Sequence, residues 1–466
     1  MLFSSITFLF YFLPIVLILY FAVPKKLKNA VLLIASLFFY AWGEPKYILL
    51  ISIEIVCGYI SGLLVEKFRE KKVSKVILFI SSMIFIGCLV YFKYADFFIS
   101  NFNAITGLSM GLLKLALPVG ISFYTFQILS YVIDVYRGDA KAQKNPINLA
   151  LYVSLFPQLI AGPIVRYADI AEQLSNRTHT LEKTYQGIRI FVVGLGKKVL
   201  IANSLGELCN AYTGRTESSV LFCWMFAIAY GLQIYFDFSG YSDMAIGLGK
   251  IFGFEFCKNF DYPYISGSIT EFWRRWHMSL GTWFRDYVYI PLGGNRCSKP
   301  RWFVNIFIVW LLTGFWHGAA WNFIIWGLFF GVFLVIEKLL LLKKLEKMKV
   351  LNHIYVIILV AISFVIFAND NFKDALTCLS GMFFMSGLPL VSHEQLYYLS
   401  SFAVILIVAV IGATPLPKKI VSKIENKKVG NLIMSIAEPV FLVVVTVVST
   451  AYLVDGSFNP FLYFRF

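Results

Sequence analysis

The chain has 466 residues, of which 59% are hydrophobic and 14% are charged, whereas soluble domains carry about 25% charged residues. A mean hydropathy of +0.74 and repeated apolar runs of about 18–20 residues indicate a polytopic helical membrane protein and argue against soluble domains. The net charge of +15 is carried by short loops between apolar runs, which favours retention of these loops in the cytoplasm over nucleic-acid binding.

Ten apolar runs predict membrane-spanning helices. The first run lies close to Met1 and is too long for a secretory leader, so we expect it to stay in the protein. The irregular region 147–210 is expected to add one to three helices, which gives about eleven spanning or membrane-embedded helices in an all-α fold. The expected spans are 3–22, 30–43, 47–65, 76–93, 116–135, 219–236, 319–336, 352–368, 397–413 and 433–454.

Clusters of Lys and Arg between these runs predict the topology. If the clusters face the cytoplasm, counting from either end of the chain places both termini on the extracytoplasmic side. We expect one membrane domain, 1–466, with N-terminal helices 1–115, a core at about 116–336, C-terminal helices 337–454 and an extracytoplasmic tail 455–466. The basic clusters lie at 24–28, 66–75, 137–144, 337–349 and 417–428.

The sequence contains no pattern typical of a resident metal or cofactor. Its seven cysteines form no C-x-x-C pair, and most of them lie in apolar runs, where they are expected to act as small hydrophobic residues. "GLGKK" at 194–198 lacks the spacer of a phosphate-binding loop. We therefore expect neither a metal site nor a bound cofactor.

Polar residues gather in "YFDFSGYSDMAIGLGKIFGF", residues 235–254. This segment is expected to place Asp237, Tyr241 and Asp243 at the end of a span, as candidate supporting residues. A hydrolase nucleophile elbow is excluded, because "GYSDM" lacks the closing glycine of G-x-S-x-G.

A second polar stretch, residues 268–294, concentrates ionisable side chains among tryptophans and tyrosines. Ser268 and Glu271 match a capping box at a helix start, and Glu271 is spaced to pair with Arg275. Charges at the bilayer centre cost about 2.5–3.5 kcal/mol each, so the stretch lies either at the interface, as an amphipathic helix, or in a protein-walled cavity. A single helix would align Trp273, Trp276, His277 and Leu280 in one aromatic stripe away from the arginines.

The apolar run 303–336 is too long for one straight span and is interrupted by "LLTGFWHGAAWNFIIWG", residues 311–327. His317 lies between Gly314 and Gly318 at this break, and Asn322 follows. Irregular backbone at membrane depth is tolerated only where protein or a water-filled cavity surrounds it. Two interpretations stay open: a functional histidine, or a buried one satisfied by a backbone carbonyl.

The chain resembles the membrane-bound O-acyltransferase (MBOAT) family, and within it the bacterial branch that contains the membrane subunit of alginate O-acetyltransferase. Relatives acetylate peptidoglycan, and a more distant one D-alanylates teichoic acid. The resemblance implies that His317 is the essential catalytic histidine, that His277 supports it, and that a central funnel brings donor and acceptor together. It is carried by "LPVGISFYTFQ", "FPQLIAGPI", "YFDFSGYSDMAIG", "NFDYPYIS", "FWRRWHMSLGTWFRDYVYIPLGGNR" and "LLTGFWHGAAWNFIIWG".

One departure from the family pattern is "FAND", residues 367–370, where this branch often has an arginine after the phenylalanine. The resemblance also implies a bacterial cytoplasmic membrane, an extracytoplasmic hydrolase-fold O-acetyltransferase partner, and a polysaccharide or peptidoglycan acceptor. The donor would be acetyl-CoA or another acyl thioester.

The chemistry fits these residues. Acetyl transfer from a thioester to a hydroxyl needs a base, and a histidine with a pKa near 6.5 suits that role, so we expect His317 to be the base. Hydrogen-bond donors must stabilise the oxyanion, and Asn322, Arg275 or indole groups such as those of Trp273 and Trp316 are candidates.

Two alternatives stay open: one concerns the role of Tyr463, and the other concerns the function of the whole chain. Tyr463, in the terminal "NPFLYFRF", either belongs to an aromatic belt or relays an acyl group outward, as the resemblance of this tail to an F-x-Y-x-x-F ending suggests. The competing function is a transporter of an acylated intermediate or polymer precursor, because broken helices with polar residues suit transporters as well. An inactive scaffold is disfavoured by the two histidines.

Overall fold

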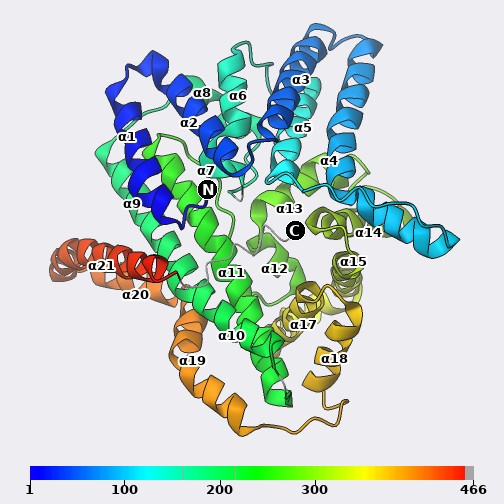
Figure 1. The fold of residues 1–466 in the computed structure, drawn as a ribbon, viewed down its shortest axis with the longest axis vertical. Coiled ribbons are helices and arrows are strands. Elements are labelled where there is room, and N and C mark those ends of the chain that lie inside the picture. Colours follow the sequence, from blue (N-terminus) through cyan, green and yellow to red (C-terminus); the bar gives the residue numbers. More distant parts are fainter. Residues whose placement is uncertain (161, 216, 457–466) are drawn as a thin grey trace. The chain divides into compact units, whose positions relative to one another are not determined.

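A computed structural model describes residues 1–160, 162–215 and 217–456, and every regular element in this part of the chain is a helix (Figure 1). Seven of the described helical segments are long and apolar enough to cross a membrane. The prediction of an all-α, multi-pass membrane protein is therefore confirmed. These segments are Ile48–Lys67, Lys72–Thr106, Val220–Ile251, Trp321–Leu345, Leu351–Ala368, His393–Gly412 and Lys428–Val454.

Each of the ten expected spans contains a helix, but α4 (Lys72–Thr106) and α11 (Val220–Ile251) run well past their expected ends at 93 and 236. In α11, 83% of the apolar window is buried inside the protein. Polar side chains there face protein and not lipid, so the helix continues where the sequence becomes polar. Asp237, Tyr241 and Asp243 thus lie within a helix of 32 residues, which continues past the expected span end at 236.

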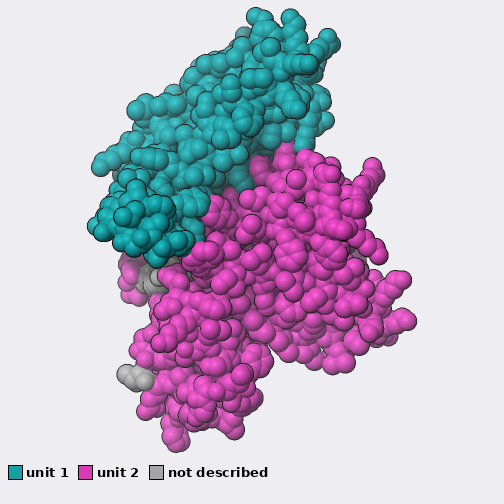
Figure 2. Space-filling view, turned by 90° about the vertical axis from the view of Figure 1, so that its right-hand side faces the viewer, with its two compact units in different colours: residues 1–191, 242–257 teal, residues 192–241, 258–466 magenta. Residues whose placement is uncertain are grey.

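The chain forms two compact units, shown in Figure 2. Unit 1 comprises residues 1–191 and 242–257. Part of its core is aromatic: the rings of Phe3, Phe8, Phe39 and Phe156 lie with centroids 4.9–6.4 Å apart. Its helices are a π-helix at Phe8–Phe12, α1 (Leu13–Ala22), a 3₁₀ turn at Lys25–Leu27, α2 (Lys28–Gly43), α3 (Ile48–Lys67), α4, α5 (Ile121–Arg137), α6 (Pro146–Ser154), α7 (Phe156–Leu159), α8 (Tyr167–Ser175), most of α9 (Leu181–Gly196) and the end of α11.

Unit 2 comprises residues 192–241 and 258–466 and contains both histidines proposed for catalysis. Within this unit, α12 to α15 and α17 lie close together in Figure 1. Its helices are the end of α9, a π-helix at Lys197–Ala202, α10 (Asn203–Thr213), the first part of α11, a 3₁₀ turn at Pro263–Ile265, α12 (Ile269–Arg275), α13 (Met278–Phe284), a π-helix at Arg285–Tyr289, α14 (Lys299–His317), α15 (Trp321–Ile336), a π-helix at Glu337–Leu341, α16 (Leu342–Leu345), α17 (Leu351–Ala368), α18 (Phe372–Met382), α19 (His393–Gly412), α20 (Leu416–Glu425) and α21 (Lys428–Val454).

Candidate active site

The predicted break in the long apolar run lies between α14 and α15. Helix α14 ends at His317, and α15 begins at Trp321. Glycines allow the two helices to pack with their backbones in contact: a Cβ added to Gly314 would lie 2.3 Å from the carbonyl oxygen of Phe323, and one added to Gly327 would lie 2.3 Å from that of Trp310. This close approach fixes the position of the histidine at the end of α14.

His317 is enclosed by aromatic rings. Its imidazole is 5.1 Å from the ring of Trp316, 5.1 Å from that of Trp326 and 5.3 Å from that of Phe367, each in an edge-to-face arrangement. These neighbours come from α14, α15 and α17, and the residue is only 6% exposed. The enclosure excludes most water from the ring, which strengthens electrostatic interactions there.

His277 lies at a break that its sequence does not reveal. Helix α12 ends at Arg275, and His277 adopts a left-handed conformation with φ of 46° before α13 begins at Met278. A left-handed backbone is rare for a residue other than glycine and marks strain that surrounding contacts must hold. The expectation of one continuous helix with His277 on an aromatic stripe is therefore wrong. The imidazole still lies among aromatic rings, 4.7 Å from that of Phe238.

A hydrogen-bond network on Asn259 determines which ring nitrogen of His277 carries the proton. Asn259 Oδ1 lies 3.2 Å from His277 Nδ1, and it also accepts hydrogen bonds from the backbone N–H of Ser279 at 3.2 Å and from its hydroxyl at 2.9 Å. A backbone N–H can only donate, so the Asn259 atom is the oxygen and His277 Nδ1 must donate to it. In a neutral ring, Nε2 is then the basic nitrogen.

Burial also favours this neutral form. His277 is 2% exposed and lies outside the apolar segments that can span the membrane. Desolvation lowers the pKa of His277 to about 3. The imidazole is therefore uncharged at neutral pH and is a hydrogen-bonding group more than a strong base.

Trp316 connects the two histidines. Its indole is 5.9 Å from the ring of His277 and 5.1 Å from that of His317, and it is 4% exposed. The structure thus brings both predicted histidines and Trp316 into one buried cluster of unit 2. A displacement of either histidine would be transmitted through this indole.

Two other predicted residues, Asn322 and Trp273, lie at the edge of this cluster. Asn322 is 1% exposed, and its amide nitrogen donates to the carbonyl oxygen of Phe367, whose ring contacts His317. Trp273 contacts Trp326 at 5.5 Å and so lies one ring away from His317. Asn322 remains a candidate oxyanion donor, because its amide has two hydrogens and this bond uses one.

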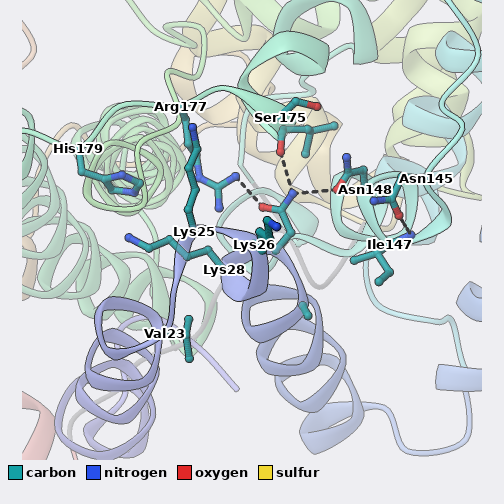
Figure 3. Close-up of a pocket in the computed structure, with 13 residues that line it drawn as sticks. Val23, Lys25, Lys26, Lys28, Asn145, Ile147, Asn148, Ser175, Arg177 and His179 are labelled. Atoms are coloured by element: carbon teal, nitrogen blue, oxygen red, sulfur yellow. Dashed lines mark hydrogen bonds between the residues drawn. The ribbon is translucent and has the colours of Figure 1, made fainter.

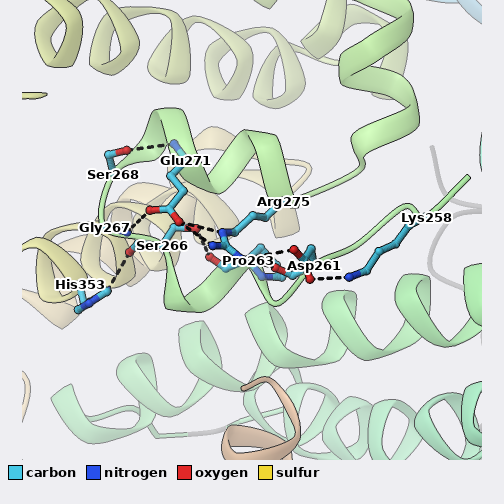
Figure 4. A network of polar contacts seen from close by, with 9 residues as sticks. All are labelled: Lys258, Asp261, Pro263, Ser266, Gly267, Ser268, Glu271, Arg275 and His353. Atoms are coloured by element: carbon cyan, nitrogen blue, oxygen red, sulfur yellow. Dashed lines mark hydrogen bonds and ion pairs between the residues drawn. The ribbon is translucent and has the colours of Figure 1, made fainter. Parts of the chain in front are cut away.

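Arg275 is held elsewhere, in the polar network of Figure 4. Its guanidinium pairs with Glu271 at 2.9 Å, and Nη1 donates to the backbone carbonyl of Asp261 at 3.1 Å. The Ser268 hydroxyl accepts from the N–H of Glu271, so the predicted helix start and the Glu271–Arg275 pair are both confirmed. These bonds tie α12 to the preceding loop.

The polar residues of α11 are divided between the two units. Asp237 forms a buried ion pair with Lys198, a residue that we did not single out from the sequence. Tyr241, one turn further along, is fully buried in unit 2, whereas Asp243 belongs to unit 1. Tyr463 lies outside the described residues.

Glu337 is a second residue that the sequence did not reveal. We assigned it to a basic loop, but it is fully buried. Its carboxylate accepts hydrogen bonds from the backbone N–H groups of Ile269 at 2.6 Å and Thr270 at 2.8 Å, and from the Thr270 hydroxyl at 2.8 Å. A carboxylate at a helix N-terminus is stabilising, so Glu337 anchors the start of α12, the helix that leads to His277.

Comparisons with known proteins support the family that the motifs indicated. The sequence model described as "MBOAT, membrane-bound O-acyltransferase family" matches residues 140–369. The chain is 40% identical over 500 aligned residues to the probable alginate O-acetylase AlgI of Azotobacter vinelandii, with 100% of both chains covered. It is 35% identical over 427 residues to the peptidoglycan O-acetyltransferase of Helicobacter pylori, covering 84% of this chain and 81% of that relative. A teichoic acid D-alanyltransferase of Bacillus subtilis is 32% identical over 231 residues, covering 46% and 57%.

Proposed function

The chain belongs to the membrane-bound O-acyltransferase family, and from this premise we propose that it transfers acetyl groups from a cytoplasmic thioester toward an extracytoplasmic polysaccharide or peptidoglycan. It is an acyltransferase and a multi-pass membrane protein. The observation that carries the proposal is the buried cluster in which His277 and His317 both contact Trp316. Relatives named for alginate and peptidoglycan acetylation support the choice of acyl group and acceptor.

In the proposed reaction, His317 acts as the general base. It takes the proton of the acceptor hydroxyl while the oxygen attacks the thioester carbonyl and forms a tetrahedral oxyanion. The C–S bond then breaks, the new ester forms, and the leaving thiolate receives the proton from the imidazolium. Two observations support His317 in this role: it is the last residue of α14, and aromatic rings surround it, so a reacting group near it is shielded from water.

His277 is proposed as a positioning residue. Its Nδ1 donates to Asn259, burial lowers its pKa to about 3, and its ring contacts Trp316, which also contacts His317. A base with so low a pKa removes a proton from an alcohol poorly at neutral pH. His277 therefore orients Trp316, and through it His317. Asn322 is proposed as a donor to the oxyanion, through the amide hydrogen that Phe367 does not use.

The direction of transfer follows from the topology expected for the loops, whereas the donor and the partner are those that the resemblance to the family implies. The basic clusters face the cytoplasm, both chain ends face outward, and the chain lies in a bacterial cytoplasmic membrane. The donor is acetyl-CoA or a similar thioester, and an extracytoplasmic hydrolase-fold O-acetyltransferase makes the final transfer to the polymer. The sequence of the tail supports Tyr463 as an acyl relay, which Tyr463→Phe tests because it removes only the acceptor oxygen.

The experiment uses the full-length protein in liposomes with acetyl-CoA labelled in the acetyl group. We expect free CoA thiol to appear together with labelled ester on the protein or on an added hydroxyl acceptor. In His317→Ala both signals should vanish while the protein remains inserted and folded. Uptake of label into the vesicles without a new ester would contradict the proposal and support the transporter.

A further inference from the structure

Unit 1 contains a cavity of about 700 Å³ whose described lining includes neither His277 nor His317 (Figure 3). It lies between the loop that joins α1 to α2, the start of α6 and the segment after α8. Four of its lining residues are cations, and a histidine also lines it: Lys25, Lys26, Lys28, Arg177 and His179. Among the described residues that line it, none is Asp or Glu.

Arg177 is built into the wall of this cavity. Its Nη1 donates to Asn29 Oδ1 at 2.6 Å, and its Nε donates to the hydroxyl of Tyr20 at 3.0 Å and to the carbonyl oxygen of Phe252 at 3.1 Å. The Asn29 amide in turn donates to Asn148 Oδ1 at 2.8 Å. The position of this guanidinium is therefore set by the fold before any ligand binds.

The charge of Arg177 is not balanced. In the part of the chain that the structure describes, its second terminal nitrogen, Nη2, is buried and has no hydrogen-bond partner. Its guanidinium contacts neutral acceptors and aromatic rings, such as that of Phe254 at 4.5 Å. A buried donor without an acceptor costs about 1–3 kcal/mol, more when it is charged. An anion in the cavity would offset this cost.

Two helix N-termini add to the positive potential. Helix α2 begins at Lys28 and α6 begins at Pro146, and residues from the first turn of each line the cavity. The helix dipole favours an anion at such a position. This positive potential also acts on the histidine in the cavity wall. Burial, together with the nearby charges of Lys28 and Arg177, lowers the pKa of His179.

We propose that this cavity binds the phosphate group of a phosphate ester. Four cations, two helix N-termini and no lining carboxylate match a ligand that carries concentrated negative charge on several oxygens. Two sources carry such a group: the headgroup of an anionic phospholipid and the phosphates of a nucleotide thioester. The exposed apolar side chains Leu19 on α1 and Ile34 on α2 would lie against lipid chains, which favours the phospholipid.

The test measures binding to the full-length protein, purified in detergent and stripped of lipid. Native mass spectrometry counts bound phosphatidylglycerol, with phosphatidylcholine as the neutral reference, and calorimetry measures binding of CoA. The variants are Arg177→Gln and, because Arg177 also supports the fold, Lys25→Gln/Lys28→Gln. The matched control is Lys343→Gln/Lys344→Gln, which removes the same charge from exposed positions outside the cavity.

We expect one ligand to bind about tenfold more weakly to each cavity variant and within about twofold of normal to the control. Selective loss of phosphatidylglycerol identifies a lipid site, and selective loss of CoA identifies a site for the phosphates of a nucleotide. Binding of both ligands that is unchanged in the cavity variants, or reduced equally in the control, would overturn the proposal. The proposed catalysis has its own readout, so its failure does not decide this result.

Discussion

The substitution Asn259→Ala tests how His277 is held. It removes one oxygen that accepts from His277 Nδ1 and from the backbone N–H and hydroxyl of Ser279. Each buried donor left without an acceptor costs about 1–3 kcal/mol, so the local structure should lose about 3 kcal/mol or more. The preference for a proton on Nδ1 rests on one of these bonds, worth about 1 kcal/mol, or about fivefold in the tautomer ratio.

The assay is acetyl transfer in liposomes, together with the midpoint of thermal unfolding. We expect Asn259→Ala to lower both, with transfer reduced by up to about fivefold because the wrong tautomer competes. Asn259→Asp is the informative control, since a carboxylate keeps an acceptor for all three donors. Its charge, close to Nδ1, should raise the pKa of His277 from about 3, so activity at neutral pH should largely return while the acid limb of the pH profile moves to higher pH.

Normal transfer by a stably folded Asn259→Ala would refute the reasoning, because His277 would then need no fixed proton. An acid limb that stays in place in Asn259→Asp would show that the ionisation of His277 does not limit the reaction. Loss of stability without any change in transfer per folded molecule would leave Asn259 a structural role only.

Three further substitutions test the packing and the buried charges of unit 2. Gly327→Ala places a Cβ 2.3 Å from the carbonyl oxygen of Trp310. The free energy of unfolding should fall by about 1–3 kcal/mol, and acetyl transfer should decrease. An unchanged melting midpoint would show that α14 and α15 can separate freely. Asp237→Asn leaves Lys198 buried without its counter-charge and should cost about 3–5 kcal/mol, whereas Asp237→Leu/Lys198→Met should recover much of the loss, as measured by denaturation. Glu337→Gln keeps one acceptor oxygen for α12 but loses the charge, so transfer should fall more than stability; equal losses in both assays would contradict a positioning role.

Local patterns predicted much of this structure. The glycines around His317 indicated the end of α14, and Ser268 and Glu271 indicated the start of α12, because each signal depends on neighbouring residues alone. The break at His277 could not be predicted in this way. Apolar and aromatic spacing continues through it, and the left-handed backbone is held by Asn259, a residue distant in sequence.

The buried polar contacts also depend on tertiary packing. The sequence placed Glu337 beside lysines, which suggested a loop, but its carboxylate reaches the backbone of α12. Lys198 follows a glycine-rich segment, and only the packing of the π-helix at Lys197–Ala202 against α11 pairs it with Asp237. Hydropathy does not predict where α11 ends, because protein surrounds most of this helix and it can therefore continue through polar residues.

The proposal that His317 is the base is tested most directly by the acetyl content of the cell-wall or secreted polymer in cells that carry only His317→Ala. With His317→Ala present in the membrane at the normal level, the account predicts complete loss of the acetyl esters that depend on this protein, and a partial loss with His277→Ala. Acetylation that persists in His317→Ala would contradict the account, because His317 is the residue proposed to take the proton from the acceptor hydroxyl.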